Sequence, residues 1–169
     1  MILATTCVIA LSAYCDIPDN AIGAFLSDPT DTNLRETPGG KIVKTVSHKG
    51  DYILCVCQPK NGWWQVHSIS DIEGNEIEVP KGDGNRWWIH SSVIALGTRN
   101  YGNQWIRIYA SPSDKSKVVF KSRKELTVTP IDIKDDGEWV KVSVTYKGKK
   151  YVGWIEGDNL CDNPVTNCC

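Results

Sequence analysis

Charge of one sign, long hydrophobic runs and helical periodicity are all scarce in this 169-residue chain. The 19 basic and 20 acidic residues nearly cancel, so the composition predicts no binding to nucleic acid and no attraction to anionic lipid. Beyond the N-terminal apolar run, no long segment places apolar residues at the 3.6-residue period of a helix. The remaining pattern consists of short apolar runs between turn residues, which is typical of strands.

A catalytic constellation is also missing. Cys55 and Cys57 lie in an apolar run where a thiolate is disfavoured, and the cysteines near the C-terminus have no neighbouring histidine. No glycine-rich phosphate loop and no C-x-x-C pair occur, and the three histidines lack ligand spacing. We therefore expect a protein that is not an enzyme and uses no cofactor and no metal. The seven cysteines are expected to form disulfides or buried thiols, with metal binding as the weaker alternative.

The first fifteen residues, MILATTCVIALSAYC, are apolar with small side chains, and the chain turns polar directly after them. This run is too short to cross a bilayer as a helix. It is similar to the apolar part of a secretory signal, although no Lys or Arg precedes it. We expect residues 1–15 to be a signal-like leader of a secreted, periplasmic or cell-envelope protein with no integral membrane segment in the mature chain. The alternative is a buried N-terminal strand or helix.

The most informative positive feature is a cassette that occurs twice. Its parts are residues 34–38, 63–66 and 88–94 in the first copy, and residues 108–112, 139–142 and 154–160 in the second. An internal repeat predicts two small copies of one domain rather than one medium-sized domain. Each copy holds about five short strands, which indicates an all-β fold of two tandem barrels, each with a short 3₁₀ turn.

The expected organisation follows the repeat. The chain divides into a leader at 1–15, a first barrel at 22–97 with an inserted hairpin at about 71–85, a second barrel at 104–161, and a cysteine-containing tail at 162–169. Residues 96–103, LGTRNYGN, are the candidate linker. Strands are expected at 24–26, 41–46, 52–57, 63–69, 86–90, 105–109, 126–129, 139–145 and 151–155, and the first 3₁₀ turn at 91–94.

Tryptophan carries the functional signal, because seven Trp and six Tyr stand against two Phe. Trp63 and Trp139 fall on the polar side of their alternating strands and are expected to face outward, where an indole often marks an interface. Packing under a loop or against the other copy is the alternative, and Trp88 and Trp154 are assigned to the core. The candidate ligand-binding residues are Trp63, Trp87, Tyr52, Asp28, Asp31 and Trp139. The two aspartates are also explained as turn-forming residues.

The order Leu-Arg-x-x-Pro, Gly-Trp-Trp-x-Val and Trp-Ile-x-Ser-Ser, at residues 34–38, 62–66 and 88–92, resembles the bacterial SH3-like domain. The likeness covers residues 22–96 and 104–161, and the second copy keeps Trp-Val-Lys-Val and Gly-Trp-Ile. It implies a binding module that contacts peptidoglycan peptides. The groove by which eukaryotic relatives bind proline-rich peptides needs a proline and an aromatic residue where His90 and Val93 stand, so that ligand is rejected.

Three functions stay open from the sequence. The first is a secreted, non-catalytic module that binds a cell-wall peptide or glycan through aromatic grooves. The second is an adaptor or inhibitor that covers a partner envelope protein such as a cell-wall hydrolase. The third is a purely structural pair of barrels, which a rigid contact hiding Trp63 and Trp139 would favour. The ligand and the oligomeric state are not determined by the sequence.

Overall fold

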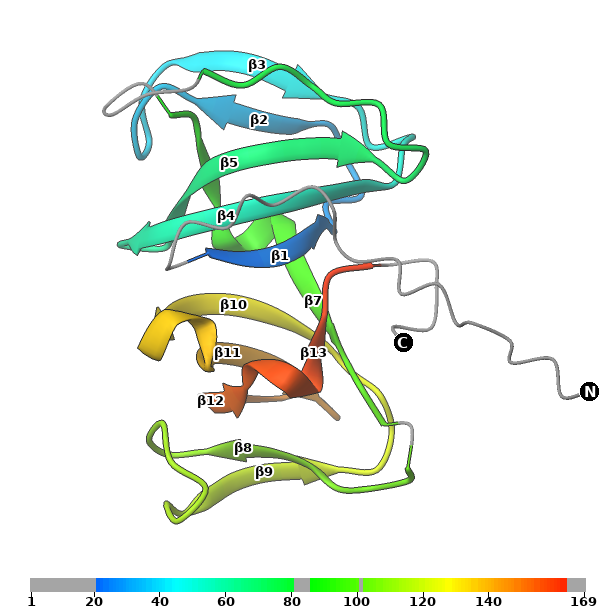
Figure 1. Ribbon diagram of the computed structural model, residues 1–169, viewed down its shortest axis with the longest axis vertical. Helices are drawn as coiled ribbons and strands as arrows, with labels where there is room; N and C mark the ends of the chain where they lie inside the picture. Colours follow the sequence, from blue (N-terminus) through cyan, green and yellow to red (C-terminus); the bar gives the residue numbers. More distant parts are fainter. Residues whose placement is uncertain (1–20, 81–85, 101, 164–169) are drawn as a thin grey trace, which may run out of the picture.

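The computed structural model describes residues 21–80, 86–100 and 102–163. The predicted leader at 1–15 and the last six residues of the tail lie outside this range. The described chain is all-β, as predicted, with antiparallel strands and three 3₁₀ turns arranged as two small barrels, one above the other (Figure 1). These residues include no helix long and apolar enough to cross a membrane.

The first barrel is built from the N-terminal half of the described chain. Its elements are β1 (Ala21–Leu26), β2 (Thr32–Arg35), β3 (Ile42–Val46), β4 (Tyr52–Lys60), β5 (Trp63–Asp71), β6 (Trp88–His90), the 3₁₀ turn η1 (Ser91–Val93) and the start of β7 (Ile94–Thr98). The β4–β5 turn has positive φ at Asn61 (52°) and Gly62 (81°), the backbone of a tight hairpin turn. The predicted 3₁₀ turn at 91–94 is confirmed by η1.

The second barrel repeats this order after β7. Its elements are β8 (Ile106–Tyr109), β9 (Val118–Ser122), β10 (Thr127–Lys134), η2 (Asp135–Gly137), β11 (Trp139–Tyr146), β12 (Lys149–Glu156), η3 (Gly157–Asn159) and β13 (Leu160–Cys161). The sheet order is β3-β2-β6-β5-β4-β1-β7-β10-β11-β12-β8-β9, with β13 on β7. β3 and β9 are therefore the two strands at the ends of this order.

β7 belongs to both barrels. Its first residues pair with β1, whereas Leu96 and Gly97 pair with β10, and Gly97 and Thr98 pair with β13. The segment crosses from the upper barrel to the lower one in Figure 1. The expected linker at 96–103 therefore overlaps a strand. β2, β7 and β9 were absent from the strands predicted from the sequence, because their apolar stretches are short and sit beside turn residues.

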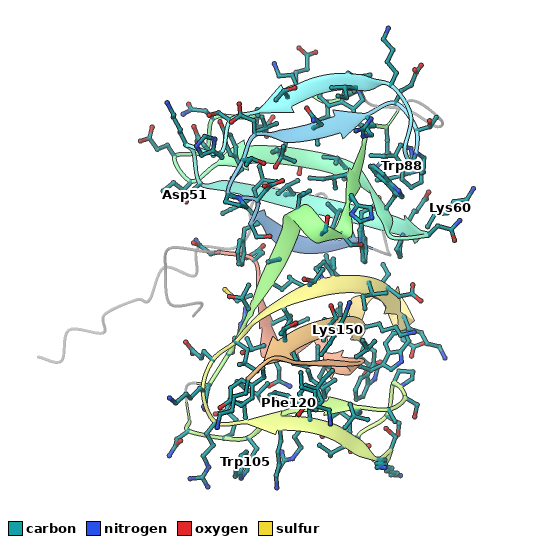
Figure 2. The ribbon with its side chains drawn as sticks, turned by 180° about the vertical axis from the view of Figure 1, so that it is seen from behind. Asp51, Lys60, Trp88, Trp105, Phe120 and Lys150 are labelled. Carbon is teal, nitrogen blue, oxygen red and sulfur yellow. The ribbon has the colours of Figure 1, made fainter. Side chains whose placement is uncertain are left out.

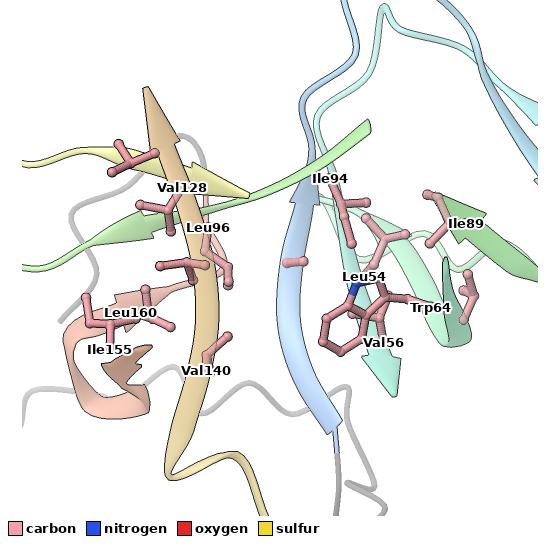
Figure 3. Close-up of a cluster of buried hydrophobic side chains, with 14 of the residues drawn as sticks. Leu54, Val56, Trp64, Ile89, Ile94, Leu96, Val128, Val140, Ile155 and Leu160 are labelled. Carbon is pink, nitrogen blue, oxygen red and sulfur yellow. The ribbon is translucent and has the colours of Figure 1, made fainter. Parts of the chain in front are cut away.

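The hydrophobic core follows the strand alternation in each barrel. Trp64 and Ile89 are fully buried in the first barrel, and Val140 and Ile155 are buried in the second (Figure 3). The indole N–H of Trp64 donates to the Ser91 hydroxyl at 3.0 Å, so its polar group is satisfied inside the core. The two groups of buried side chains form one continuous cluster across β1 and β7. The joint between the barrels is thus packed as well as hydrogen-bonded.

Candidate functional site

Four side chains gather on the outer face of the first barrel, and we call them the Trp63 cluster: Arg35, Trp63, Trp88 and His90. Trp88 pairs with Arg35 of β2, and His90 pairs with Trp63 of β5. Because Ile89 between them points into the core, Trp88 and His90 face outward. All four side chains are only partly buried.

The rings and the guanidinium of this cluster lie close together. The Arg35 guanidinium carbon is 5.9 Å from the centre of the Trp63 ring, within the range of a cation–π contact. The His90 ring meets Trp63 edge to face at 4.9 Å. One guanidinium nitrogen of Arg35 donates to the Gly40 carbonyl at 2.6 Å, which orients the group. Its other N–H groups have no hydrogen-bond partner among the described residues and are available to a ligand.

Ser92, the second residue of the 3₁₀ turn η1, orients the His90 ring. Its Nδ1 accepts the Ser92 backbone N–H at 3.2 Å and lies 2.7 Å from the Ser92 hydroxyl. With Nδ1 acting as an acceptor, we assign the proton of the neutral ring to Nε2. The cluster therefore offers donors from Arg35 and His90 beside two indole surfaces, and it contains no carboxylate.

The same register positions of the second barrel keep the two tryptophans but carry Tyr109 in place of Arg35 and Glu156 in place of His90. Trp154 pairs with Tyr109 of β8 and Lys141 of β11, and Glu156 pairs with Trp139. The Tyr109 ring meets Trp139 edge to face at 5.8 Å, and Trp139 is only 8% exposed. Trp154 is partly buried, with the Lys141 ammonium 5.8 Å from its ring centre.

These positions correct three tryptophan assignments. Trp139, predicted to face outward as a ligand-binding residue, is buried, and the Tyr109 ring of β8 packs edge to face against it from across β12. Trp88 and Trp154, predicted to be core residues, are partly exposed. Trp64 is the fully buried indole of the first barrel. The missed signal is the alternation itself, because an isoleucine directly follows Trp88 and Trp154 and takes the inward position in both repeats.

Two further candidates lie away from the Trp63 cluster. Tyr52 pairs with Asp71, at the opposite end of the β4–β5 hairpin from Trp63, and packs against the core. Trp87 also packs against the core, while its carbonyl accepts the Val66 N–H at 2.8 Å. Neither side chain is therefore a wall of a groove at Trp63.

The two candidate aspartates both have partners within the protein. Asp28 accepts the backbone N–H and the hydroxyl of Thr30 at 2.9 and 2.8 Å, which is a turn-stabilising arrangement. Asp31 accepts the His48 N–H at 3.0 Å and lies 2.7 Å from its ring Nδ1. These hydrogen bonds hold the pKa of Asp31 below its usual value. The structure therefore gives both carboxylates a role in shaping loops.

The described cysteines are placed for stability rather than reactivity. Cys55 and Cys161 are both disulfide-bonded, as the preference for disulfides or buried thiols predicted. Cys57 is a free thiol, 1% exposed, and burial raises its pKa despite the nearby Arg86 guanidinium. Within the described ranges, no group of three or more His, Cys, Asp or Glu residues is arranged to hold a metal ion.

The comparisons with known proteins do not assign this chain to a family. No protein-family model matches the chain, and no curated protein matches it. Among solved structures, NlpC2 from Trichomonas vaginalis is similar at 18% identity and a TM-score of 0.31, over 85% of this chain and 49% of that one. NlpC1 from the same organism is similar at 19% identity and a TM-score of 0.32, over 90% and 49%. The chain thus spans about half the length of either protein.

Proposed function

We propose that the protein is a non-catalytic envelope module that binds a cell-wall peptide through the Trp63 cluster of its first barrel. The observation that supports this proposal most strongly is the cluster's composition. Two partly exposed indole rings stand beside a guanidinium with unused donors, on rigid strands rather than on a loop. Such a surface can hold a ligand but offers no nucleophile or paired acid and base for a reaction.

The chemistry of the cluster favours a ligand rich in acceptors. A guanidinium recognises carboxylates through paired hydrogen bonds, and the Nε2–H of His90 adds a further donor. The indoles of Trp63 and Trp88 supply flat apolar surface for aliphatic side chains or sugar rings. A short peptide that carries free carboxylates and aliphatic groups satisfies both requirements, as the peptides of peptidoglycan do.

The proposal is tested by binding of soluble muropeptides to the full chain, measured by calorimetry. Arg35→Gln and Trp88→Ala should each weaken binding at least about tenfold, because each removes a buried contact of the ligand. The matched control is Trp154→Ala, the same position in the second barrel, which should leave the affinity unchanged. The free energy of unfolding should change by less than about 1 kcal/mol in Arg35→Gln.

Two results would contradict this function. One is the absence of measurable muropeptide binding by the unaltered protein, together with no retention on purified peptidoglycan. The other is equal weakening by Trp88→Ala and Trp154→Ala, which would show that the first barrel holds no special site.

A further inference from the structure

The second barrel carries a cationic surface on its β8–β9 hairpin. We call the group formed by Trp105, Arg107, Lys121 and Arg123 the Trp105 cluster. Arg107 and Lys121 pair across the two strands, and Trp105 directly precedes β8. The inward neighbours Ile106, Ile108 and Phe120 are buried, so the alternation directs the cluster away from the core.

Trp105 is the most exposed indole among the described residues, at 37%. The Lys121 ammonium and the Arg123 guanidinium carbon both lie 4.8 Å from its ring centre. Both are cation–π distances, so the ring organises two positive charges around itself. This arrangement places an exposed apolar ring and two positive charges together at one place on the surface.

Among the described residues, no carboxylate forms an ion pair with this cluster. The single ion pair within the described ranges joins His48 to Asp31 in the first barrel. The balance of the whole chain hides an uneven distribution, because residues 96–169 hold twelve basic and nine acidic side chains and residues 1–95 hold seven and eleven. The near-zero net charge therefore says little about the potential at the β8–β9 hairpin.

The position of the β8–β9 hairpin favours a partner with a broad, flat surface. β8 and β9 form the lower end of the molecule along its longest axis, and Trp105 lies at that end (Figure 2). An end surface can meet a plane without interference from the first barrel. It also leaves the Trp63 cluster, on the other barrel, free for its own ligand.

We propose that the β8–β9 hairpin docks the protein onto an anionic phospholipid surface. Indole side chains favour the headgroup layer, where the ring is apolar and its N–H stays hydrated. Arg107, Lys121 and Arg123 face lipid phosphates, and each basic residue near such a surface adds to the attraction. This association is peripheral and depends on salt, because it is largely electrostatic. It does not depend on the function proposed for the first barrel.

Co-sedimentation of the full chain with vesicles tests the proposal. Binding should occur to a roughly 2:1 mixture of phosphatidylcholine and phosphatidylglycerol and not to phosphatidylcholine alone. The double variant Lys121→Glu with Arg123→Glu should bind at least about tenfold more weakly. Its matched control is Lys41→Glu with Lys44→Glu, which makes the same charge change at exposed positions on or beside β3, the strand at the other end of the sheet.

The variant Trp105→Ala distinguishes binding to a bilayer from binding to a soluble polyanion. On vesicles it should weaken binding several-fold, since the ring no longer enters the headgroup layer. Equal weakening by the two double variants would overturn the proposal, because net charge alone would then explain binding. Equal binding to neutral vesicles would also overturn it. Tight binding of polyphosphate that Trp105→Ala leaves unchanged, with weak vesicle binding, would assign the surface to a soluble polymer instead.

Discussion

The two barrels place a tryptophan at the same register position and give it opposite environments. Trp63 is the first residue of β5, and Trp139 is the first residue of β11. Each pairs with the last residue of the following strand, His90 of β6 or Glu156 of β12. Trp63 stays partly exposed beside Arg35, whereas Trp139 is buried under Tyr109. The exposure of an outward tryptophan therefore depends on a side chain from another strand, Arg35 of β2 or Tyr109 of β8, and not on the pattern of its own strand.

The residues that directly precede β2 and β8 also lie in different environments. Asp31 directly precedes β2 and pairs with His48, whereas Trp105 directly precedes β8 and contacts Lys121 and Arg123. The site before β2 is closed by contacts between His48 and Asp31, and the site before β8 holds two cations against an indole ring. The two barrels thus present outer surfaces with different chemistry.

The largest effect is expected from Trp64→Ala. This side chain is fully buried and hydrogen-bonded, so its removal should lower the free energy of unfolding by about 3–5 kcal/mol. Its counterpart Val140 is a much smaller side chain, and Val140→Ala should cost less. Urea melts of both variants measure this difference. A similar loss in the two variants would mean that the barrels do not fill their cores differently.

The direct test of the comparison replaces the two outer tryptophans. Trp139→Ala should destabilise the protein by about 3 kcal/mol, because Trp139 is buried against Tyr109. Trp63→Ala should cost less than about 1.5 kcal/mol, since part of the ring is already in water. Both values come from urea melts at one pH. A larger loss for Trp63→Ala would reverse the assignment of the exposed and the buried ring.

The smallest effect concerns the contact between Asp31 and His48. His48 stabilises the ionised form of Asp31, so the pKa of Asp31 lies below the ordinary value of 3.8. A lowered folded-state pKa stabilises the fold above 3.8, and this contribution is lost as the pH falls through the folded pKa. Carboxyl-carbon NMR titration should show this depression of the pKa, and His48→Ala should reduce it without abolishing it, because the backbone N–H of residue 48 still donates to Asp31. The pKa of Asp71, lowered by hydrogen bonds from Asn75, should not move in that variant.

The sequence predicted much of the architecture because local signals were strong. Alternation in β5 and β11 placed these two strands correctly. The sequence did not predict β7, because Gly97 and the polar residues after it are typical of a linker. Pairing with β1, β10 and β13 makes the segment a strand. Such pairing involves residues far apart in the chain and leaves no local signal.

The candidate site was found only in part. Trp63 was identified, but Arg35, Trp88 and His90 were not, because their proximity arises when β2, β5 and β6 pair. The same pairing explains why Tyr52 and Trp87 are not beside Trp63. Neighbours across a sheet are set by register, and a one-residue change of register moves every side chain to the other face.

The sequence by itself determined that this protein is an all-β duplication with tryptophan-rich strands, because turn residues and alternation act locally along the chain. Only the tertiary structure decided which indoles meet water, that β7 serves both barrels, and where the positive charge gathers. The physical reason is that burial and electrostatic potential depend on the side chains brought together across strands, which composition and local pattern do not contain.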